Sequence, residues 1–308
     1  LRVSHTRYVY FLMEPPIYAH YNLQNLRNIF NYTMTFYRDS DIYNPYGLFV
    51  RRRHPQLELE GKDYAAGKSK MAVWFASHCP TRSLRERLVK ELQKHVSVTT
   101  YGGCGVNSCP IMDTQNSDRC LRIMEKLYKF YLAFENALCT EYVTEKFFGA
   151  ARFDMVPVVY GFADYSAVAP PHSYINVLDF PSVKHLADYL LYLDRNHTAY
   201  NQYFRWKVEY ESLMYYRALK PHDYNNISWC QLCEKLHTDN QTKSYRSLAI
   251  WPPRATCLNH KNIQVKSFVT AHKQSYFSLP ASVPITYKSS HSLLHTNKAT
   301  LVYLHQCQ

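Results

Sequence analysis

Apolar and polar residues follow a regular order along the chain from Lys70 onward. Short continuous apolar runs, which predict buried strands, are followed by stretches in which apolar residues recur every three or four positions, as in a helix. The predicted strands are residues 71–77, 96–101, 128–134, 155–160 and 173–180, and the predicted helices are residues 141–152, 183–193 and one that begins at Ser83. This alternation predicts βαβ units and a parallel sheet covered by helices on both faces.

The helix that begins at Ser83 has a start signal of its own. Glu86 follows Ser83 by three residues, which is the spacing of a capping box. Four apolar residues fall on one face of this helix, namely Leu84, Leu88, Leu92 and Val96. We therefore predict an amphipathic helix that packs on the sheet.

The pattern differs on either side of this region. Residues 8–12 and 34–37 predict strands, residues 23–30 predict a short helix, and residues 39–47 predict a polar turn. Residues 197–216 are aromatic and predict a helix. From Thr238 onward no periodicity remains.

These changes divide the chain into four predicted parts. They are residues 1–66, residues 67–215, a segment 216–239 that contains a Cys-x-x-Cys sequence, and residues 240–308. The last part has no recognisable organisation, and either disorder or an altered reading of the gene would account for it.

The formal net charge of +12 predicts an anionic partner. Lys and Arg residues are dispersed, and the one tight cluster is Arg51-Arg52-Arg53. No nucleic-acid-binding motif accompanies them. A basic surface that includes a pocket for phosphates is therefore favoured over a nucleic-acid-binding surface.

Cysteines and glycosylation sequences favour the secretory pathway. The chain has nine cysteines and four Asn-x-Ser/Thr sequences, at Asn31, Asn196, Asn226 and Asn240. The context of Asn31 is aromatic and predicts burial. No apolar run approaches the ~20 residues that span a bilayer. The pairing of the nine cysteines stays open.

Cys230 and Cys233 form a single Cys-x-x-Cys sequence. A structural zinc site would need further ligands at suitable spacing, and a thioredoxin-type motif would need a βαβ setting. A disulfide or a short loop staple is therefore the favoured interpretation.

Two groups of polar residues follow predicted strands. Arg85 lies in the first turn of the helix after residues 71–77, where a guanidinium and free backbone N–H groups suit a diphosphate. Asn136 lies at the end of strand 128–134, and Glu145 and Lys146 begin the next helix. Lys146 suits the charge of a departing nucleoside diphosphate, and Glu145 suits ribose or sugar hydroxyls. Solvated helix faces are the alternative for both groups.

Carboxylates near the N-terminus suggest two other chemistries. Glu14 ends a very apolar strand and precedes two prolines. Such a setting would raise the pKa of the carboxyl group towards the working pH, which suits a general base, and a buried ion pair with a nearby Arg is equally compatible. Asp39 and Asp41 form an Asp-x-Asp triplet that suits a divalent metal on a diphosphate, although a turn braced by Asp side chains fits it at least as well.

Several of these segments together resemble the α1,3-fucosyltransferase family, glycosyltransferase family 10. The matching segments, which occur in the family's order over about residues 7–237, are MEPP (13–16), TMTFYRDSDIYNPYG (33–47), ASHCPTRSLRERLVKEL (76–92) and the run from FEN to VPVV (134–159). The run YGGCGVNSC (101–109) resembles invertebrate and plant-type members.

The resemblance implies an α/β protein of GT-B-like fold with two Rossmann-like halves. Residues 1–66 would be part of an incomplete acceptor half, and residues 67–215 would bind GDP-fucose. Glu14 matches the family's catalytic base. The matches to its donor-contacting positions are Arg85, Asn136, Tyr142, Glu145 and Lys146.

The implied reaction inverts the configuration at the fucose anomeric carbon and places fucose in α1,3 linkage on N-acetylglucosamine of a glycoprotein or glycolipid. The family implies no required metal, with Mn²⁺ as a stimulating ion at most. It also implies a Golgi enzyme with a lumenal catalytic domain and a type II membrane anchor. The chain starts at Leu1, so we expect the anchor, the stem and the first half of the acceptor domain to precede it.

His78 and Phe36 depart from the family's usual Asn and Tyr, and we expect both changes to be tolerated. Two other functions remain open. An inactive fragment could retain nucleotide-sugar or glycan binding, and a metal-dependent transferase could use Asp39 and Asp41. The choice between a core N-glycan and a Lewis-type acceptor also stays open.

Overall fold

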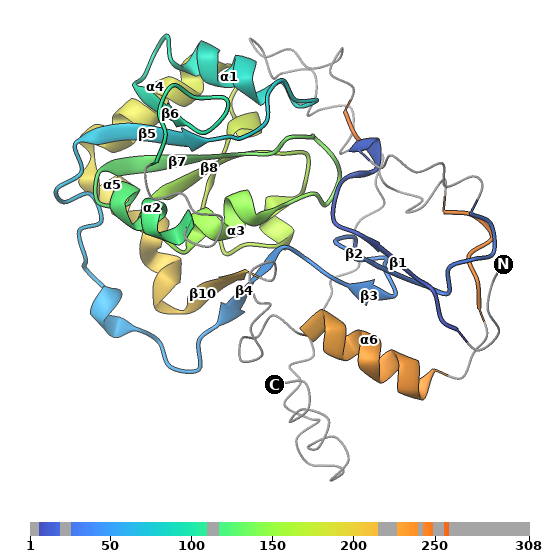
Figure 1. Cartoon of the computed structure of the whole chain (residues 1–308). Helices are drawn as coiled ribbons and strands as arrows, with labels where there is room; N and C mark the ends of the chain where they lie inside the picture. The colour runs from blue at the N-terminus through green and yellow to red at the C-terminus, as the bar shows by residue number, and fades with distance from the viewer. Residues whose placement is uncertain are drawn as a thin grey trace.

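A five-stranded parallel sheet forms the centre of the larger part of the protein (Figure 1). A computed structural model describes residues 6–18, 26–109, 117–214, 227–239, 243–248 and 256–258. The strand order in this sheet is β6-β5-β7-β8-β9. The strands are β5 (Lys70–Phe75), β6 (Val98–Tyr101), β7 (Tyr128–Phe134), β8 (Val156–Tyr160) and β9 (Ile175–Asn176). The predicted α/β class with a parallel sheet is confirmed.

Helices cover both faces of this sheet (Figure 1). They are α1 (Arg85–Leu92), α2 (Ser117–Met124), α3 (Glu145–Ala151), α4 (Val183–Arg195) and α5 (His197–Asn201). Alternate residues of a strand face opposite sides, so Phe130 and Leu132 pack with α1 and α4, whereas Tyr131 and Ala133 pack with α2 and α3. Because both faces are covered, every residue of β7 and β8 is buried, as their continuous apolar sequences predict.

The N-terminal residues form a second, smaller sheet. Its parallel strands, in the order β1-β2-β3, are β1 (Val9–Leu12), β2 (Tyr32–Thr35) and β3 (Ile42–Tyr43). Helix α6 (Ile227–Thr238) packs on this sheet through Leu232. Ser228 Oγ also donates a hydrogen bond of 2.9 Å to the carbonyl oxygen of Tyr43.

A two-stranded antiparallel sheet joins distant parts of the sequence. Strand β4 (Gly47–Arg51) pairs with β10 (Tyr210–Met214), beside α3. Gly47 lies so close to Phe148 of α3 that a Cβ atom there would be 2.5 Å from that ring. The described residues also form 3₁₀ helices, η1 (Pro16–Tyr18), η3 (Leu57–Leu59), η4 (Tyr165–Ala167), η5 (Val177–Asp179) and η6 (Gln202–Val208).

The predicted capping box at Ser83 is wrong. Helix α1 starts at Arg85, after Leu84 in the left-handed conformation with φ 55°. Ser83 Oγ instead donates to the Glu135 carbonyl oxygen at 2.6 Å, and Glu86 accepts from Thr81 Oγ1 at 3.0 Å. Ser83 thus bonds to the segment after β7, and Glu86 bonds to its own loop, in place of the predicted reciprocal cap.

Other predicted boundaries also differ. Residues 26–30 of the predicted helix 23–30 are not helical, and the strand predicted at 173–180 is reduced to β9, followed by η5. Helix α3 starts at Glu145 because Thr144 caps it. The helix predicted over 197–216 gives way to η6 and then to β10, which pairs with a strand about 160 positions earlier in the sequence.

Parts of residues 240–308 contact the folded protein, so the expectation of a tail without organisation fails for 243–248 and 256–258. Tyr245 N donates to the Phe30 carbonyl oxygen at 2.9 Å, and Lys243 forms an ion pair with Asp41. Cys257 forms a disulfide with Cys139. The other calls on this tail lie outside the described residues.

Two further disulfides join Cys79 to Cys104 and Cys109 to Cys120. Cys230 and Cys233 lie on helix α6 and form no disulfide with each other, so the prediction of a loop staple is wrong. Among the helices that the structure describes, none has the length and apolarity to cross a membrane.

Candidate functional site

The strand order of the larger sheet indicates where a ligand would bind. Strand β6 follows β5 in the sequence and lies on one side of it, and the next strand, β7, lies on the other side of β5. The direction in which successive strands are added to the sheet therefore reverses between β5 and β7. In open parallel sheets, ligands bind outside the carboxyl ends of the strands at this switch point. Residues that follow Phe75 and Phe134 therefore form the candidate site.

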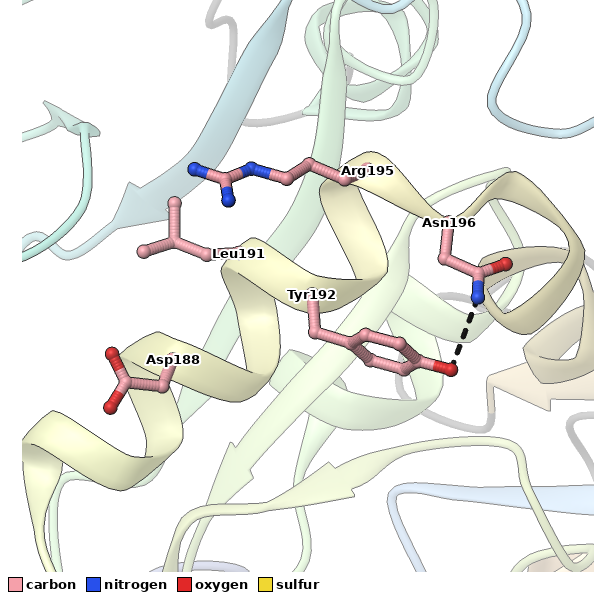
Figure 2. Close-up of a pocket in the computed structure, with 5 residues that line it drawn as sticks. All are labelled: Asp188, Leu191, Tyr192, Arg195 and Asn196. Carbon is pink, nitrogen blue, oxygen red and sulfur yellow. Dashed lines mark hydrogen bonds between the residues drawn. The ribbon is translucent and has the colours of Figure 1, made fainter.

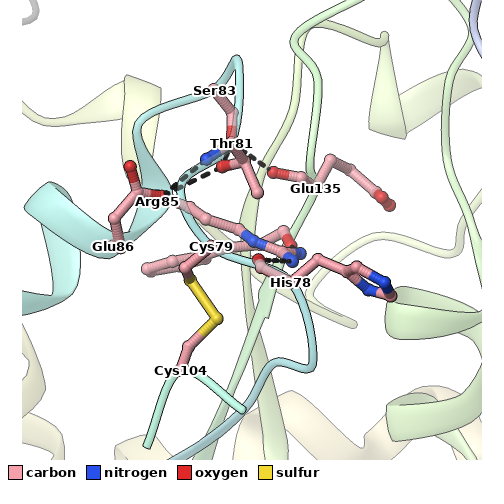
Figure 3. Close-up of a disulfide and its surroundings, with 9 residues drawn as sticks. His78, Cys79, Thr81, Ser83, Arg85, Glu86, Cys104 and Glu135 are labelled. Carbon is pink, nitrogen blue, oxygen red and sulfur yellow. Dashed lines mark hydrogen bonds between the residues drawn. A yellow bond between two sulfur atoms is a disulfide. The ribbon is translucent and has the colours of Figure 1, made fainter. Parts of the chain in front are cut away.

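Arg85 spans the gap between the two strand ends (Figure 3). Its Nη1 donates to the Phe134 carbonyl oxygen at 2.9 Å, and its Nη2 donates to the His78 carbonyl oxygen at 3.2 Å. The residue is only 3% exposed, and its Nε atom has no hydrogen-bond partner among the described residues. Burial lowers the pKa of Arg85, and the charges of Glu135 and Glu86 oppose this shift. Arg85 thus places a buried positive charge at the switch point.

A disulfide fixes the loop that carries His78. Cys79 is bonded to Cys104, so the loops after β5 and β6 are joined (Figure 3). Gly102 has φ +87°, and a Cβ atom there would lie 2.7 Å from the Ala76 carbonyl oxygen. The two loops therefore pack closely beside Arg85.

Glu135 and Lys146 form a second charged group at this edge. Glu135 is fully buried and accepts hydrogen bonds from Thr144 N at 2.9 Å and from Thr144 Oγ1. Lys146 Nζ lies 3.5 Å from Glu135 Oε2 and 2.9 Å from Glu145 Oε1, and it also donates to Thr144 Oγ1. The predicted pair Glu145–Lys146 thus belongs to a network of three charges.

The pKa values of this group follow from burial and mutual charge. Burial raises the pKa of Glu135, and the charge of Lys146 opposes that shift. Burial also disfavours the charged form of Lys146, but Glu135 and Glu145 outweigh it and raise the pKa of Lys146. Burial acts on Glu145 too, yet Lys146 dominates and lowers the pKa of Glu145. Lys146 therefore carries its positive charge at neutral pH.

Asn136 connects the site to the N-terminal segment. Its carbonyl oxygen accepts hydrogen bonds from Ser83 N at 3.1 Å and from Tyr18 OH at 3.1 Å. Tyr18 OH in turn accepts from Arg82 N at 3.2 Å. Asn136 Oδ1 is buried and has no hydrogen-bond partner within the described ranges. Two buried polar atoms at this edge, Arg85 Nε and Asn136 Oδ1, are thus unsatisfied, which is unusual in a folded protein.

Glu14 lies beside another predicted site residue. Tyr142 OH donates to Glu14 Oε2 at 3.4 Å. Tyr142 is 1% exposed, and burial raises its pKa well above the ordinary value. Glu14 itself is exposed, so the expectation of a buried carboxyl group or a buried ion pair is wrong. The apolar strand β1 ends at Leu12, so the Glu14 side chain lies outside the strand and is exposed to solvent.

The Asp41 side chain is bound by residues from two other segments of the chain. Its carboxylate accepts hydrogen bonds from Thr33 N at 2.8 Å and from Tyr245 OH at 2.8 Å, and it pairs with Lys243. Burial would raise the pKa of Asp41, but these donors, Lys243 first, lower it. Asp39 is exposed, and no cluster of three metal-ligating side chains occurs in the part of the chain that the structure describes. The partners of Asp41 favour the braced turn over a metal site.

Glu135 and Tyr18 were not predicted as site residues. Glu135 could have been predicted, because it is a charged residue that directly follows a fully apolar strand at its carboxyl end. Tyr18 could not, since its partners Arg82 and Asn136 are distant in the sequence.

Residues 65–251 match the family described as glycosyltransferase family 10 (fucosyltransferase) C-term, and residues 1–47 match the family described as fucosyltransferase, N-terminal. The first of these matches covers more than half of the chain. The chain belongs to glycosyltransferase family 10. The motif resemblance to the α1,3-fucosyltransferases is therefore confirmed, and the match extends beyond residue 237, where the motifs ended.

Named family members show the same relation. The chain is 37% identical over 270 residues to alpha-(1,3)-fucosyltransferase C of Drosophila melanogaster. This match covers 81% of this chain and 60% of that protein. It is 36% identical to glycoprotein 3-alpha-L-fucosyltransferase A of the same organism, with 81% and 49% covered. It is 36% identical to alpha-(1,3)-fucosyltransferase fut-1 of Caenorhabditis elegans, with 76% and 54% covered. The chain thus spans roughly half to three fifths of these relatives.

The fold has a solved counterpart. A crystal structure of an α1,3-fucosyltransferase superposes with a TM-score of 0.50 at 21% identity, over 78% of this chain and 76% of the other. The GT-B-like fold predicted for this family member is thus confirmed at the level of the fold.

Proposed function

We propose that this chain is the catalytic part of a fucosyltransferase that moves L-fucose from GDP-fucose to a hydroxyl of N-acetylglucosamine in a glycan, in α1,3 linkage. Family membership and the names of the relatives support this proposal. The observation that carries it is the site itself, where the carboxyl ends of two strands bring together the cations Arg85 and Lys146, and where Arg85 Nε and Asn136 Oδ1 are buried without a hydrogen-bond partner among the described residues. A nucleoside diphosphate supplies both negative charge and hydrogen-bonding groups for such a site.

The reaction is a single displacement. The acceptor hydroxyl oxygen forms a bond to the fucose anomeric carbon while the bond between that carbon and the diphosphate oxygen breaks. The electron pair leaves with GDP, and the hydroxyl proton passes to the Glu14 carboxylate. Attack on the face opposite to the leaving group inverts the configuration. The exposure of Glu14 lets an acceptor approach it, and the Tyr142 hydroxyl orients its carboxylate.

Residues around the switch point bind the sugar donor, GDP-fucose. Arg85 and Lys146 stabilise the charge on the departing diphosphate without a required metal. Asn136 Oδ1 accepts a hydrogen bond from GDP-fucose, and Glu145 accepts hydrogen bonds from the ribose or sugar hydroxyls of GDP-fucose. Mn²⁺ is at most a stimulating ion in this scheme, so activity should persist in excess chelator. Loss of all activity on chelation would instead favour the metal-dependent alternative.

Release of GDP from GDP-fucose, measured with a panel of core N-glycan and N-acetyllactosamine acceptors, tests the proposal. Glu14→Gln should reduce kcat by about 10²-fold or more, as expected for loss of a general base. The exposed Glu58→Gln is the matched control and should behave like the unchanged chain. Equal GDP release by Glu14→Gln and the unchanged chain would contradict the role of Glu14.

A second function uses the same donor site. A protein that binds nucleotide sugar through Arg85, Asn136 and Lys146 without turnover is the alternative. Calorimetry distinguishes the two: GDP-fucose binding without GDP release on any acceptor would favour the binding function.

The proposed location is the Golgi lumen, on a type II membrane anchor. The three disulfides among the described residues support an oxidising compartment. Co-localisation of the complete protein with a Golgi marker, and protection of this domain from protease in sealed vesicles, would test the location and the orientation.

A further inference from the structure

Two Asn-x-Ser/Thr sequences lie in the described part of the chain, and fucose transfer explains neither of them. Asn31 is 1% exposed. Its Oδ1 accepts from Tyr8 N at 2.9 Å, and its Nδ2 donates to the Lys243 carbonyl oxygen at 2.7 Å. A sugar on Nδ2 has no room in this buried position. The folded protein therefore excludes a glycan at Asn31.

Asn196 has a different environment. It lies between α4 and α5, and its Oδ1 caps α5 by accepting from Ala199 N at 3.0 Å. Its Nδ2 donates to Tyr192 OH at 3.1 Å (Figure 2). An amide nitrogen has two hydrogens, and this bond uses one. The other is available for substitution, and the adjoining His197 and Thr198 are exposed.

A depression borders Asn196 (Figure 2). Its volume is about 480 Å³, and its lining residues are Asp188, Leu191, Tyr192, Arg195 and Asn196. The Tyr192 side chain is 51% exposed and offers an aromatic face to a ligand. The carboxylate of Asp188 and the guanidinium of Arg195 offer an acceptor and donors for hydroxyl and acetamido groups.

We propose that Asn196 carries an N-linked glycan whose first N-acetylglucosamine packs on Tyr192 in this depression. The donor is a lipid-linked oligosaccharide diphosphate. The bond between Asn196 Nδ2 and C1 of the sugar forms, the bond between C1 and the diphosphate oxygen breaks, and the electron pair leaves with the lipid diphosphate. Nδ2 loses one proton, which passes through a base of the transferring enzyme to water. The remaining N–H keeps its hydrogen bond to Tyr192.

The glycan lies far from the donor site. Lys129, at the start of β7, pairs with Asp194 Oδ1 at 2.7 Å and also donates to the Asp194 carbonyl oxygen. Asn196 therefore lies at the amino edge of the sheet. The seven residues of β7 place its carboxyl edge about 20 Å away. The glycan should leave fucose transfer unchanged.

Peptide mapping by mass spectrometry of the secreted 308-residue chain tests the site. The peptide with Asn196 should carry a glycan, and the peptide with Asn31 should not. Thr198→Ala should remove the glycan, whereas Thr198→Ser should keep it. An unmodified Asn196 in the secreted protein, or a glycosylated Asn31, would overturn the proposal. Since secretory entry rests on the proposed location, GDP release is measured separately, and its failure would concern only the proposed function.

Packing of the first sugar on Tyr192 has a test of its own. A peptide N-glycosidase that accepts core-fucosylated glycans should release the glycan from folded Tyr192→Ala several-fold faster than from the unchanged chain. After denaturation the two rates should be equal. Equal rates in the folded state would overturn the packing, and the exposed Tyr192→Phe, which keeps the ring, is the matched control.

Discussion

At the scale of single residues, buried charge organises the donor edge. Glu135 is fully buried. Its carboxylate accepts a hydrogen bond from the backbone N–H of Thr144, the residue that caps α3, and forms an ion pair with Lys146. A buried carboxylate is costly unless donors surround it, so its presence here requires these partners. Glu135 is therefore a positioning residue for Lys146.

Glu135→Gln should destabilise the protein and weaken donor binding. The amide keeps the shape but cannot accept from all the present donors, and loss of charge-assisted hydrogen bonds costs about 1.5–3 kcal/mol. Urea unfolding should show this loss, and the KM for GDP-fucose should rise more than kcat falls. An unchanged KM with lower stability would reduce Glu135 to a structural role. The exposed Glu58→Gln is the control.

Asp41 makes stability depend on pH. Its folded pKa is lowered, so its contribution is present above the unfolded pKa of about 4 and is lost as pH falls through the folded value. Asp41→Asn should therefore lower the Tm at pH 7, and the difference from the unchanged chain should shrink below about pH 4. Melting curves from pH 3 to pH 7 measure this. A difference that stays constant with pH would contradict the role of the Asp41 charge.

At the scale of elements, the sequence predicted those whose determinants are local. Strand β7 and the positions of Asn136 and Lys146 at its edge follow from a continuous apolar run and the βαβ pattern. Where long-range contacts decide, prediction failed. Ser83 bonds to the Glu135 carbonyl and not to its own helix, and β10 forms because β4 lies beside it. The exposure of Glu14 likewise depends on the end of β1 and not on its apolar sequence.

The Cys79–Cys104 disulfide offers a test at this scale. Its 25-residue separation predicts about 3.5 kcal/mol of stabilisation from chain entropy. Cys79→Ala with Cys104→Ala should lower the free energy of unfolding by roughly that amount. It should also raise the KM for GDP-fucose, because the loop that holds Arg85 through His78 is loosened. Removal of the Cys109–Cys120 pair is the control and should leave the KM unchanged.

At the scale of the whole molecule, residues beyond α6 return to both sheets. Lys243 and Tyr245 bind Asp41 beside the small sheet, and Cys257 is bonded to Cys139 after β7. These contacts could not be predicted from the sequence, because the segment has no periodicity and its partners lie elsewhere in the chain.

A chain that ends at Thr242 should therefore melt well below the complete chain. It loses one disulfide, an ion pair and the backbone hydrogen bonds of Tyr245. A chain that ends at Leu258 keeps every one of these contacts and is the matched control. Calorimetric melting of the three chains measures the effect, and equal Tm values for the complete chain and the one ending at Thr242 would contradict it.

The Cys139–Cys257 bond also determines what a protease can separate. It closes a loop of 118 residues that contains α3, β8 and α4. A single cut within this loop leaves the two pieces covalently joined, so nicked protein migrates as one species on a non-reducing gel and as two after reduction. For this chain, an intact band without reductant is no proof of an intact backbone.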